Sequence, residues 1–258
     1  KNCDRWKTLC HDCPLQHEYP KTLVDRSTKN FELKKKLFGG NKHLSIVACS
    51  KWMGNFVKES FLKNKPLAVI HNGVDLKVFH PTLPKKSFED GKFRVIAVSN
   101  VWNKEKGIND IYKLREVLSD DYQITIVGLS DKQMKTLPPD IIGIQRTQNV
   151  QELVNLYSES DVLVNPTYAD TFPTVNLEAL ACGTPIITSC TGGSPEAIDE
   201  KTGVVVEQGN VKALAEAILK MKEKKLFAID CRKRAERFFD KDKCYEECIK
   251  LYEQLIRS

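Results

Sequence analysis

Apolar and polar residues follow a regular pattern from residue 93 onward. Short runs rich in Val and Ile are each followed by a longer stretch whose apolar positions have helical spacing. The predicted strands are 93–100, 122–128, 141–146, 161–167, 184–189 and 202–208. The predicted helices are 107–119, 150–160, 174–183 and 211–224. Because such strands are buried on both faces and joined through helices, this part predicts a doubly wound α/β domain with a parallel sheet.

The chain before residue 93 carries fewer elements. Residues 44–50 predict a strand, 51–63 a helix, and 66–70 a second short apolar run before a turn. These elements are too few for a sheet of their own. We therefore expect residues 1–80 to be the C-terminal part of an N-terminal domain and the proline-marked residues 81–91 to be a linker.

A C-terminal domain then spans residues 92–240, and residues 241–258 form a final helix. The apolar positions of this helix lie on one face, at residues 244, 248, 249, 252, 255 and 256. Such a face needs a partner surface.

Two acids flank a predicted helix start in the stretch "NPTYADTFPTVNLEALACGTPIIT". Pro173 suits a first helical turn, so the amides of residues 171–175 are left without backbone partners and favour an anion such as phosphate. Glu178 on the helix and Asp170 on the loop can each accept hydrogen bonds from hydroxyls. A phosphate site between two acids that bind hydroxyls is the arrangement expected for a sugar nucleotide. In the alternative, Asp170 caps the turn and Glu178 is a surface acid, and spacing alone favours it.

Two further strand ends carry candidate ligand groups. Lys106 and Gly107 follow the strand at 93–100 and open the next predicted helix, which places an ammonium group near the same crevice. Gly192 and Gly193 allow a close backbone approach to a ligand, and Ser194 is suited to cap a short helix. A plain turn explains these glycines equally well.

The net charge of +6 is concentrated at the start of the chain. Residues 1–90 hold 17 Lys and Arg against 9 Asp and Glu, whereas residues 91–258 hold 23 against 25. A basic face of this kind suits anionic lipid or an acidic ligand, or is simply solvated. No nucleic-acid recognition motif accompanies the charge.

Nine cysteines, mostly scattered singly, are typical of reduced cytosolic thiols. The exception is Cys10 and Cys13, in C-x-x-C spacing with Cys3 nearby, which suits a structural zinc site, a redox pair or free thiols. The chain has no apolar signal core, so we expect no export. It begins at Lys1 without an element of its own, so we expect that a preceding segment is missing.

Four motifs in fixed order carry a resemblance: "HNGVD", "WNKEKG", the two acids within "DTFPTVNLEALACGTPIIT", and "TGGSPEAI". Together they resemble the retaining glycosyltransferases of family four, which have the GT-B architecture, over nearly the whole chain. The start "WKTLCHDCP", with "EYP" and "SKW" after it, is similar to the end of the N-terminal domain in a bacterial polysaccharide-assembling branch. The resemblance implies a C-terminal Rossmann-like domain, the tail of a truncated N-terminal Rossmann-like domain, and a final helix that returns to the latter.

The resemblance also implies roles for individual residues. Glu178 would bind the ribose hydroxyls, Asp170 the donor sugar and Lys106 the diphosphate. Further nucleotide-sugar contacts would come from Asn100, Lys104, Gly128, Arg146, Val150, Thr171, Phe172, Pro173 and Thr174. The sequence departs from the family in two places. Asp170 stands where the family usually has Glu, and Asn100 to Trp102 stand where it has an arginine. Either Lys104 substitutes for that arginine or the site works with less charge.

The implied activity is transfer of a sugar from a UDP- or GDP-sugar to a bacterial polysaccharide or lipid-linked glycan, with retention of configuration. It needs no metal or other cofactor, because the leaving phosphate takes the acceptor's proton. The implied location is cytoplasmic, with a peripheral membrane contact through the basic N-terminal part, and we expect no activity from this fragment alone. Two alternatives remain: a nucleotide-sugar epimerase of the same architecture, and an inert sugar-nucleotide-binding module.

Overall fold

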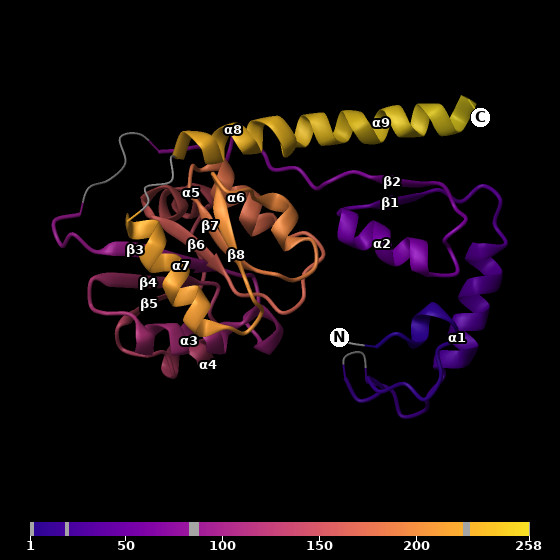
Figure 1. Cartoon of the computed structure of the whole chain (residues 1–258), viewed down its shortest axis with the longest axis horizontal. Helices are drawn as coiled ribbons and strands as arrows, with labels where there is room; N and C mark the ends of the chain where they lie inside the picture. Colours follow the sequence, from indigo (N-terminus) through magenta and orange to yellow (C-terminus); the bar gives the residue numbers. More distant parts are fainter. Residues whose placement is uncertain (1–2, 19–20, 83–87, 224–227, 258) are drawn as a thin grey trace. The chain divides into compact units, whose positions relative to one another are not determined.

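The computed structural model of the chain is shown in Figure 1. It describes residues 3–18, 21–82, 88–223 and 228–257. The chain divides into two compact units, Lys1–Ile70 and His71–Ser258. The division lies at residue 70, whereas the sequence led us to expect it at residue 80.

Backbone hydrogen bonds explain why residues after Ile70 belong to the second unit. The Val74 amide donates to the Phe239 carbonyl at 2.7 Å, and the Lys241 amide donates to the Val74 carbonyl at 3.1 Å. The Lys241 ammonium also pairs with Asp75 at 2.5 Å. This segment is therefore tied to the end of the chain rather than to the residues before it. The domain roles we assigned stay predictions.

The second unit contains a six-stranded sheet in the order β5-β4-β3-β6-β7-β8, and every pairing is parallel. Its strands are β3 (Phe93–Val98), β4 (Tyr122–Val127), β5 (Ile141–Ile144), β6 (Val162–Asn165), β7 (Ile186–Ser189) and β8 (Gly203–Val206). All six lie in the predicted runs, so the predicted doubly wound α/β fold is confirmed. The sheet order reverses at β3, which pairs with both β4 and β6. Ligands bind at such a reversal point, outside the carboxyl ends of the strands.

Helices cover both faces of this sheet (Figure 1). The helices of the second unit are α3 (Ile108–Val117), α4 (Asp131–Lys135), α5 (Val150–Glu159), α6 (Thr174–Ala181), α7 (Val211–Glu223), α8 (Ala228–Phe238) and α9 (Lys241–Arg257), with 3₁₀ turns η3 (Lys104–Lys106) and η4 (Ser194–Ala197). On one face α3 and α7 pack over a core that includes Val95, Ile124 and Val162. On the other, α5, α6 and α8 pack together.

Two local expectations need correction. Helix α4 was not predicted; Ser130 and Gln133 form a capping box at its start. Lys106 does not open α3, because it lies in the separate turn η3. Gly107 ends that turn with φ +77°, and its Cα lies so close to Pro166 that an added Cβ would be 2.2 Å from the Pro166 carbonyl oxygen. Only glycine fits that position without strain.

The first unit is small. Its elements are η1 (Arg5–Lys7), α1 (Ser27–Lys34), the π-helical turn η2 (Lys35–Gly39), β1 (Ile46–Ala48), α2 (Lys51–Glu59) and β2 (Leu67–Val69). The strands β1 and β2 are joined through α2 and pair in parallel, so these residues form a two-stranded sheet of their own, which the sequence analysis did not expect. Trp6 stacks on Phe56 of α2, with 5.1 Å between ring centroids.

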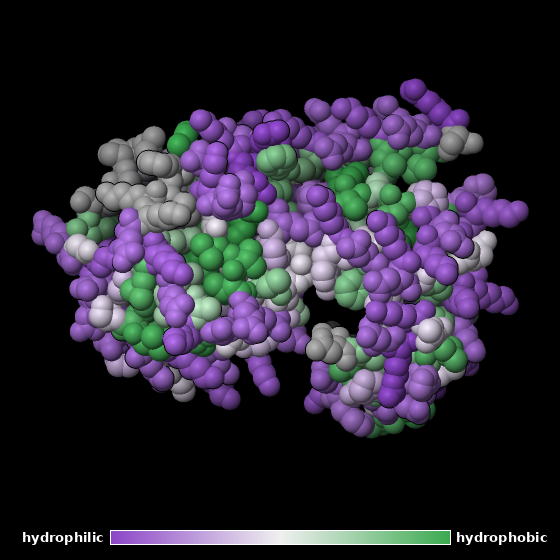
Figure 2. Space-filling view, in the orientation of Figure 1, coloured by the Kyte–Doolittle hydropathy of each residue, from purple (hydrophilic) through white to green (hydrophobic). Residues whose placement is uncertain are grey.

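Helix α9 carries the apolar positions predicted for the final helix. Of these positions, Ile249, Tyr252 and Ile256 are more than half exposed, whereas Cys244 is buried. That this helix returns to the N-terminal domain stays a prediction. The surface in Figure 2 is largely hydrophilic, with smaller apolar areas among the polar ones. Within the described stretches, every helix is too short or too polar to cross a membrane.

Candidate nucleotide-sugar site

A pocket of about 490 Å³ opens at the carboxyl ends of β3 and β6, where the strand order reverses. Its lining comes from the segment after β3, from the loop between β6 and α6, and from α5 and α6. The lining residues are Val98, Ser99, Asn100, Val101, Trp102, Asn103, Lys106, Leu153, Asn165, Asp170, Phe172, Pro173, Thr174, Val175 and Glu178. The three charged side chains singled out from the sequence, Lys106, Asp170 and Glu178, therefore share one pocket.

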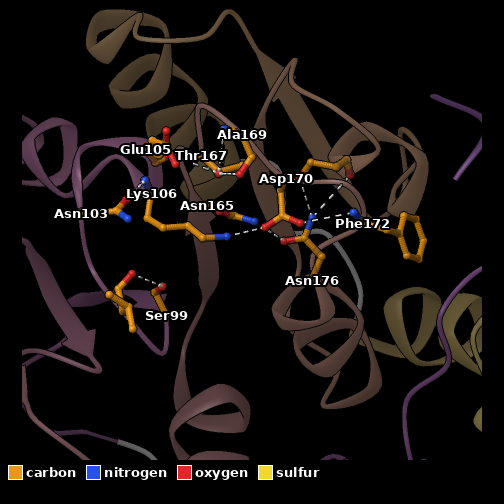
Figure 3. Close-up of polar contacts among 12 residues, drawn as sticks. Ser99, Asn103, Glu105, Lys106, Asn165, Thr167, Ala169, Asp170, Phe172 and Asn176 are labelled. Carbon is orange, nitrogen blue, oxygen red and sulfur yellow. Dashed lines mark hydrogen bonds and ion pairs between the residues drawn. The ribbon is translucent and has the colours of Figure 1, made fainter. Parts of the chain in front are cut away.

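Lys106 and Asp170 form an ion pair, with 2.6 Å between Nζ and Oδ2 (Figure 3). The turn η3 and the loop after β6 are joined by their backbones, since the Tyr168 amide donates to the Glu105 carbonyl at 2.7 Å. The other Asp170 oxygen accepts the Phe172 amide at 3.3 Å. Asp170 thus caps its turn, as the alternative interpretation proposed, and also holds the predicted phosphate-binding lysine.

Glu178 is not a surface acid. It is partly buried, and its Oε2 accepts a hydrogen bond from the Tyr157 hydroxyl at 2.9 Å. Burial raises the pKa of the Glu178 carboxyl, while hydrogen bonds from Tyr157 and Thr174 lower it. Because Glu178 lines the pocket, its carboxylate can accept hydrogen bonds from a bound ligand.

Helix α6 begins at Thr174, with Pro173 at the N-cap position. Pro173 therefore precedes the helix by one residue rather than starting it. In the described structure no side chain caps this end of α6, so its first amides face the pocket region without a side-chain acceptor. This end of the helix suits an anion.

A buried polar network supports the floor of the site. The Asn165 amide donates to the Asn176 side-chain oxygen at 2.9 Å, and the Asn176 amide donates to the Ser194 hydroxyl at 3.0 Å. Figure 3 shows Asn165 and Asn176 beside Asp170. Ser194 lies 2.6 Å from the Thr188 hydroxyl, so it belongs to this network and does not cap η4 as we predicted.

The backbone at Gly192 makes a close approach, but to another segment of the protein rather than to an open ligand site. Its φ is +58°, and an added Cβ would lie 1.7 Å from the Asp170 carbonyl oxygen. The "TGGSPEAI" segment thus packs against the backbone that carries Asp170. Its glycine is required by this packing.

Several residues implied by the resemblance lie outside the pocket lining. They are Lys104, Gly128, Arg146, Val150 and Thr171. Lys104, Arg146, Val150 and Thr171 are exposed, and Gly128 packs against the Ser99 backbone. The position of Lys104 favours a site that works with less positive charge over a lysine that replaces the missing arginine. Ligand roles for these five residues stay predictions.

Sequence reasoning missed most of the apolar lining. Trp102 is buried, and its indole nitrogen donates to the Val127 carbonyl at 2.8 Å. Leu153, on α5, lies in the lining although no motif marks it. Trp102 was detectable, because it occupies the segment where the family has its arginine. Leu153 could not be detected, because it occupies an apolar position with the helical spacing found in any helix that packs on a core.

The cysteine cluster belongs to the first unit, and none of its residues is in the lining of this pocket. Burial and the neighbouring Cys3 and Cys13 thiols raise the pKa of Cys10. Among described residues, no three His, Cys, Asp or Glu side chains are grouped so as to hold a metal ion. The zinc site of Cys3, Cys10 and Cys13 therefore stays a prediction without geometric support.

Solved structures identify the architecture. Sucrose-phosphate synthase from Thermosynechococcus elongatus superposes with a TM-score of 0.78 at 22% identity, over 92% of this chain and 64% of that one. Anabaena HepE in complex with UDP and glucose superposes with a TM-score of 0.71 at 16% identity, over 87% and 67%. The chain therefore has the fold of GT-B glycosyltransferases, as predicted.

Sequence comparison identifies the family. The glycosyl transferases group 1 model matches residues 79–238, and the chain belongs to this family. It is 32% identical over 155 residues to D-inositol 3-phosphate glycosyltransferase of Arthrobacter sp. strain FB24, covering 52% of this chain and 37% of that protein. It is 28% identical over 172 residues to the capsular polysaccharide biosynthesis glycosyltransferase CapM of Staphylococcus aureus, covering 60% and 44%. It is 25% identical over 221 residues to an α-1,3-N-acetylgalactosaminyltransferase of Campylobacter jejuni that acts on diacetylbacillosaminyl-diphospho-undecaprenol, covering 79% and 58%. The chain thus spans about half the length of these relatives.

Proposed function

We propose that this chain carries the donor-binding half of a retaining glycosyltransferase that uses a UDP- or GDP-sugar. The observation that carries the proposal is the pocket itself. The partly buried carboxylate of Glu178 and the Lys106–Asp170 ion pair line this pocket, which lies at the reversal point of a GT-B sheet, and this supports the proposal.

Each charged group has a role in this proposal. Glu178 accepts hydrogen bonds from the ribose hydroxyls, and Asp170 accepts one from the donor sugar. Lys106 and the first amides of α6 hold the diphosphate. Trp102, Leu153 and Val101 give the pocket an apolar wall that a nucleobase can cover.

The names of relatives support a role in polysaccharide or glycolipid assembly. The Staphylococcus aureus relative is named for capsular polysaccharide biosynthesis, and the Campylobacter jejuni relative for a polyprenol diphosphate-linked acceptor. We propose an acceptor of this class, a growing glycan or a lipid-linked one. The Anabaena structure that shares the fold contains UDP and glucose, which supports a nucleotide sugar as donor.

The proposed chemistry needs neither a protein nucleophile nor a metal ion. The bond between the anomeric carbon and the diphosphate oxygen breaks, and the acceptor oxygen bonds to that carbon on the same face. The acceptor's proton passes to the leaving diphosphate oxygen. Lys106 and the α6 amides stabilise the charge that develops on the diphosphate, which is catalysis by placement and preorganised electrostatics.

Nucleotide binding is the first test of this proposal, and it can be made on this chain. A thermal-shift screen of UDP, GDP and their sugars against other nucleoside diphosphates is expected to select a uridine or guanosine series. At 100 times the dissociation constant the ligand should stabilise the fold by about 2.7 kcal/mol. Equal stabilisation by every nucleotide, or by none, would refute the proposed donor class.

Two lysines in one turn provide a matched pair of variants. Lys106→Met removes the ammonium group that lines the pocket, so UDP or GDP affinity should fall about 10- to 100-fold, the scale of a charged hydrogen bond. Lys104→Met changes an exposed neighbour outside the lining and should leave affinity within about 2-fold. If Lys104→Met causes the larger loss, the diphosphate lies elsewhere.

Transfer itself is tested with the intact protein. Incubation with donor and a polyprenol diphosphate-linked glycan is expected to lengthen the glycan with an α-configured product from an α-linked donor. An altered donor sugar without any transfer would indicate an epimerase. Binding without turnover would indicate an inert module.

A peripheral membrane contact through the basic N-terminal part of the chain is a separate proposal. Residues 1–90 carry an excess of 8 positive charges, which suits an anionic lipid surface. Flotation with vesicles of phosphatidylglycerol should carry the chain, and vesicles of phosphatidylcholine alone should not. Equal flotation with both would refute an electrostatic contact.

A further inference from the structure

Glu178 is contacted by a tyrosine, Tyr157, that belongs to none of the sequence motifs. Tyr157 lies in α5 with no exposed surface, and it is outside the pocket lining. Its hydroxyl nevertheless reaches Glu178 Oε2 at 2.9 Å. Glu178 therefore lies between the pocket on one side and the Tyr157 hydroxyl on the other.

The position of the Tyr157 ring is fixed by its surroundings. Its backbone carbonyl accepts the Thr184 hydroxyl at 2.6 Å and the Ser160 amide at 3.0 Å. The ring packs edge-on against Phe79, with 6.5 Å between centroids. Because Tyr157 has no exposed surface, its ring has little rotamer freedom, and its hydroxyl is held toward Glu178 before any ligand binds.

Glu178 needs such a donor because burial removes water from its carboxylate. An ionised carboxylate has about four lone-pair positions for hydrogen bonds. The Tyr157 hydroxyl fills one of these positions. The positions that remain are enough to accept both hydroxyls of a vicinal diol.

We propose that Tyr157 is a positioning residue for donor binding: it holds the Glu178 carboxylate in place, so that its free acceptor positions face the ribose. This inference rests on the proposed hydroxyl-binding role of Glu178. It predicts that Tyr157 contributes to nucleotide affinity although it touches no ligand atom. A purely structural tyrosine would contribute to stability alone.

The experiment compares variants of the whole 258-residue chain in UDP and GDP titrations, using whichever nucleotide binds. Tyr157→Phe keeps the ring and removes the hydroxyl, and affinity should fall about 3- to 20-fold, a fraction of a full charged hydrogen bond. Tyr112→Phe is the control, because the Tyr112 hydroxyl is also buried but has no hydrogen-bond partner among the described residues. Affinity of the control should stay within about 2-fold.

A double-mutant cycle separates positioning from general damage. In a Glu178→Gln background the carboxylate is absent, so adding Tyr157→Phe should change affinity by less than about 2-fold. If Tyr157→Phe weakens binding equally in both backgrounds, or in neither, the positioning role is overturned. If Glu178→Gln binds as tightly as the parent, the hydroxyl-binding role of Glu178 in the proposed function fails instead.

The pH profile provides a second readout that a structural role would not move. Burial raises the pKa of Glu178 and the Tyr157 hydrogen bond lowers it. Affinity that needs the ionised carboxylate is present above this pKa and is lost as pH falls through it, so Tyr157→Phe should move the loss to higher pH. The other titratable groups near Glu178 are Cys182, whose pKa burial raises to about 12, and the pocket residues Lys106 and Asp170. These groups and the nucleotide's own phosphate are the same in parent and variant, so the ratio of the two affinities isolates Glu178.

A variant that strengthens the hydrogen bond from Tyr157 to Glu178 keeps the proposal testable if Tyr157→Phe does not fold. Site-specific 3,5-difluorotyrosine at position 157 keeps the ring and makes its hydroxyl a stronger donor. The loss of affinity should then move to lower pH than in the parent. An unchanged profile would contradict the proposal.

Discussion

The ion pair between Lys106 and Asp170 predicts that removing a charged pocket residue, Asp170, strengthens nucleotide binding rather than weakens it. Asp170→Asn removes a negative charge beside the proposed diphosphate position and releases Lys106 from its partner. The Asn side-chain oxygen can still accept the Phe172 amide, so the loop should keep its shape. We therefore expect Asp170→Asn to bind a bare nucleoside diphosphate more tightly than the parent does.

The magnitude follows from the exposure of the pair. The Lys106 side chain is 34% exposed and the Asp170 side chain 16%. The pair thus lies between a surface ion pair, worth about 0 to 1 kcal/mol, and a charged hydrogen bond of about 1.5 to 3 kcal/mol. A diphosphate that no longer competes for Lys106 should gain about 0.7 to 1.4 kcal/mol, or about 3- to 10-fold in affinity.

The assay is calorimetric titration of the parent and variants with UDP or GDP and with the corresponding nucleotide sugar. Asp75→Asn is the matched control, since Asp75 forms a similar pair with Lys241 away from the pocket lining, and its affinity should not change. Transfer by the intact Asp170→Asn enzyme should fall, because the proposed sugar contact is lost. If Asp170→Asn weakens diphosphate binding as much as Lys106→Met does, Asp170 holds the lysine in place for the ligand, and the reasoning is wrong.

Three further predictions concern metal, backbone and thiols. UDP or GDP should raise the melting temperature equally with and without EDTA, because ammonium and amide groups replace a bridging cation in the proposed site; strict metal dependence would contradict this. Gly192→Ala should lower the free energy of unfolding by about 2 to 4 kcal/mol in denaturant titrations, since its Cβ would lie 1.7 Å from a backbone oxygen, whereas Gly91→Ala, with φ +61° and nothing within 4 Å, should cost about 1 kcal/mol. If Cys3, Cys10 and Cys13 bind zinc with a further ligand, elemental analysis should find about one equivalent per chain, and its absence would leave them as free thiols.

The sheet was predictable because each strand is a continuous apolar run between turn residues. Ile124 and Leu163 lie fully buried in the middle of two such runs. Helix α4 was missed because five residues give no apolar period to detect. Its signal was the capping box of Ser130 and Gln133, which spacing alone could have revealed.

The site was predictable only in part. Local motifs mark which residues belong to it, but they do not show which of these side chains contact one another. Lys106, Asp170 and Glu178 follow strand ends, and parallel strands bring their carboxyl ends to one edge. That Lys106 pairs with Asp170, and that Tyr157 supports Glu178, depends on how loops and helices pack across the sheet. No sequence spacing encodes these contacts.

The Lys106–Asp170 pair also bears on how the proposed site would distinguish a nucleotide sugar from a bare nucleotide. With a bare diphosphate, Lys106 must leave Asp170 or be shared with it, and the carboxylate then lies unpaired near a second anion. With a nucleotide sugar, a sugar hydroxyl donates to Asp170 as Lys106 turns to the diphosphate, so both groups keep a partner. Sugar binding and diphosphate binding would therefore be coupled, because both replace the same contact between Lys106 and Asp170. The shorter Asp170, in place of the family's usual Glu, suits this arrangement because its carboxylate reaches the lysine and the turn amide of Phe172 together.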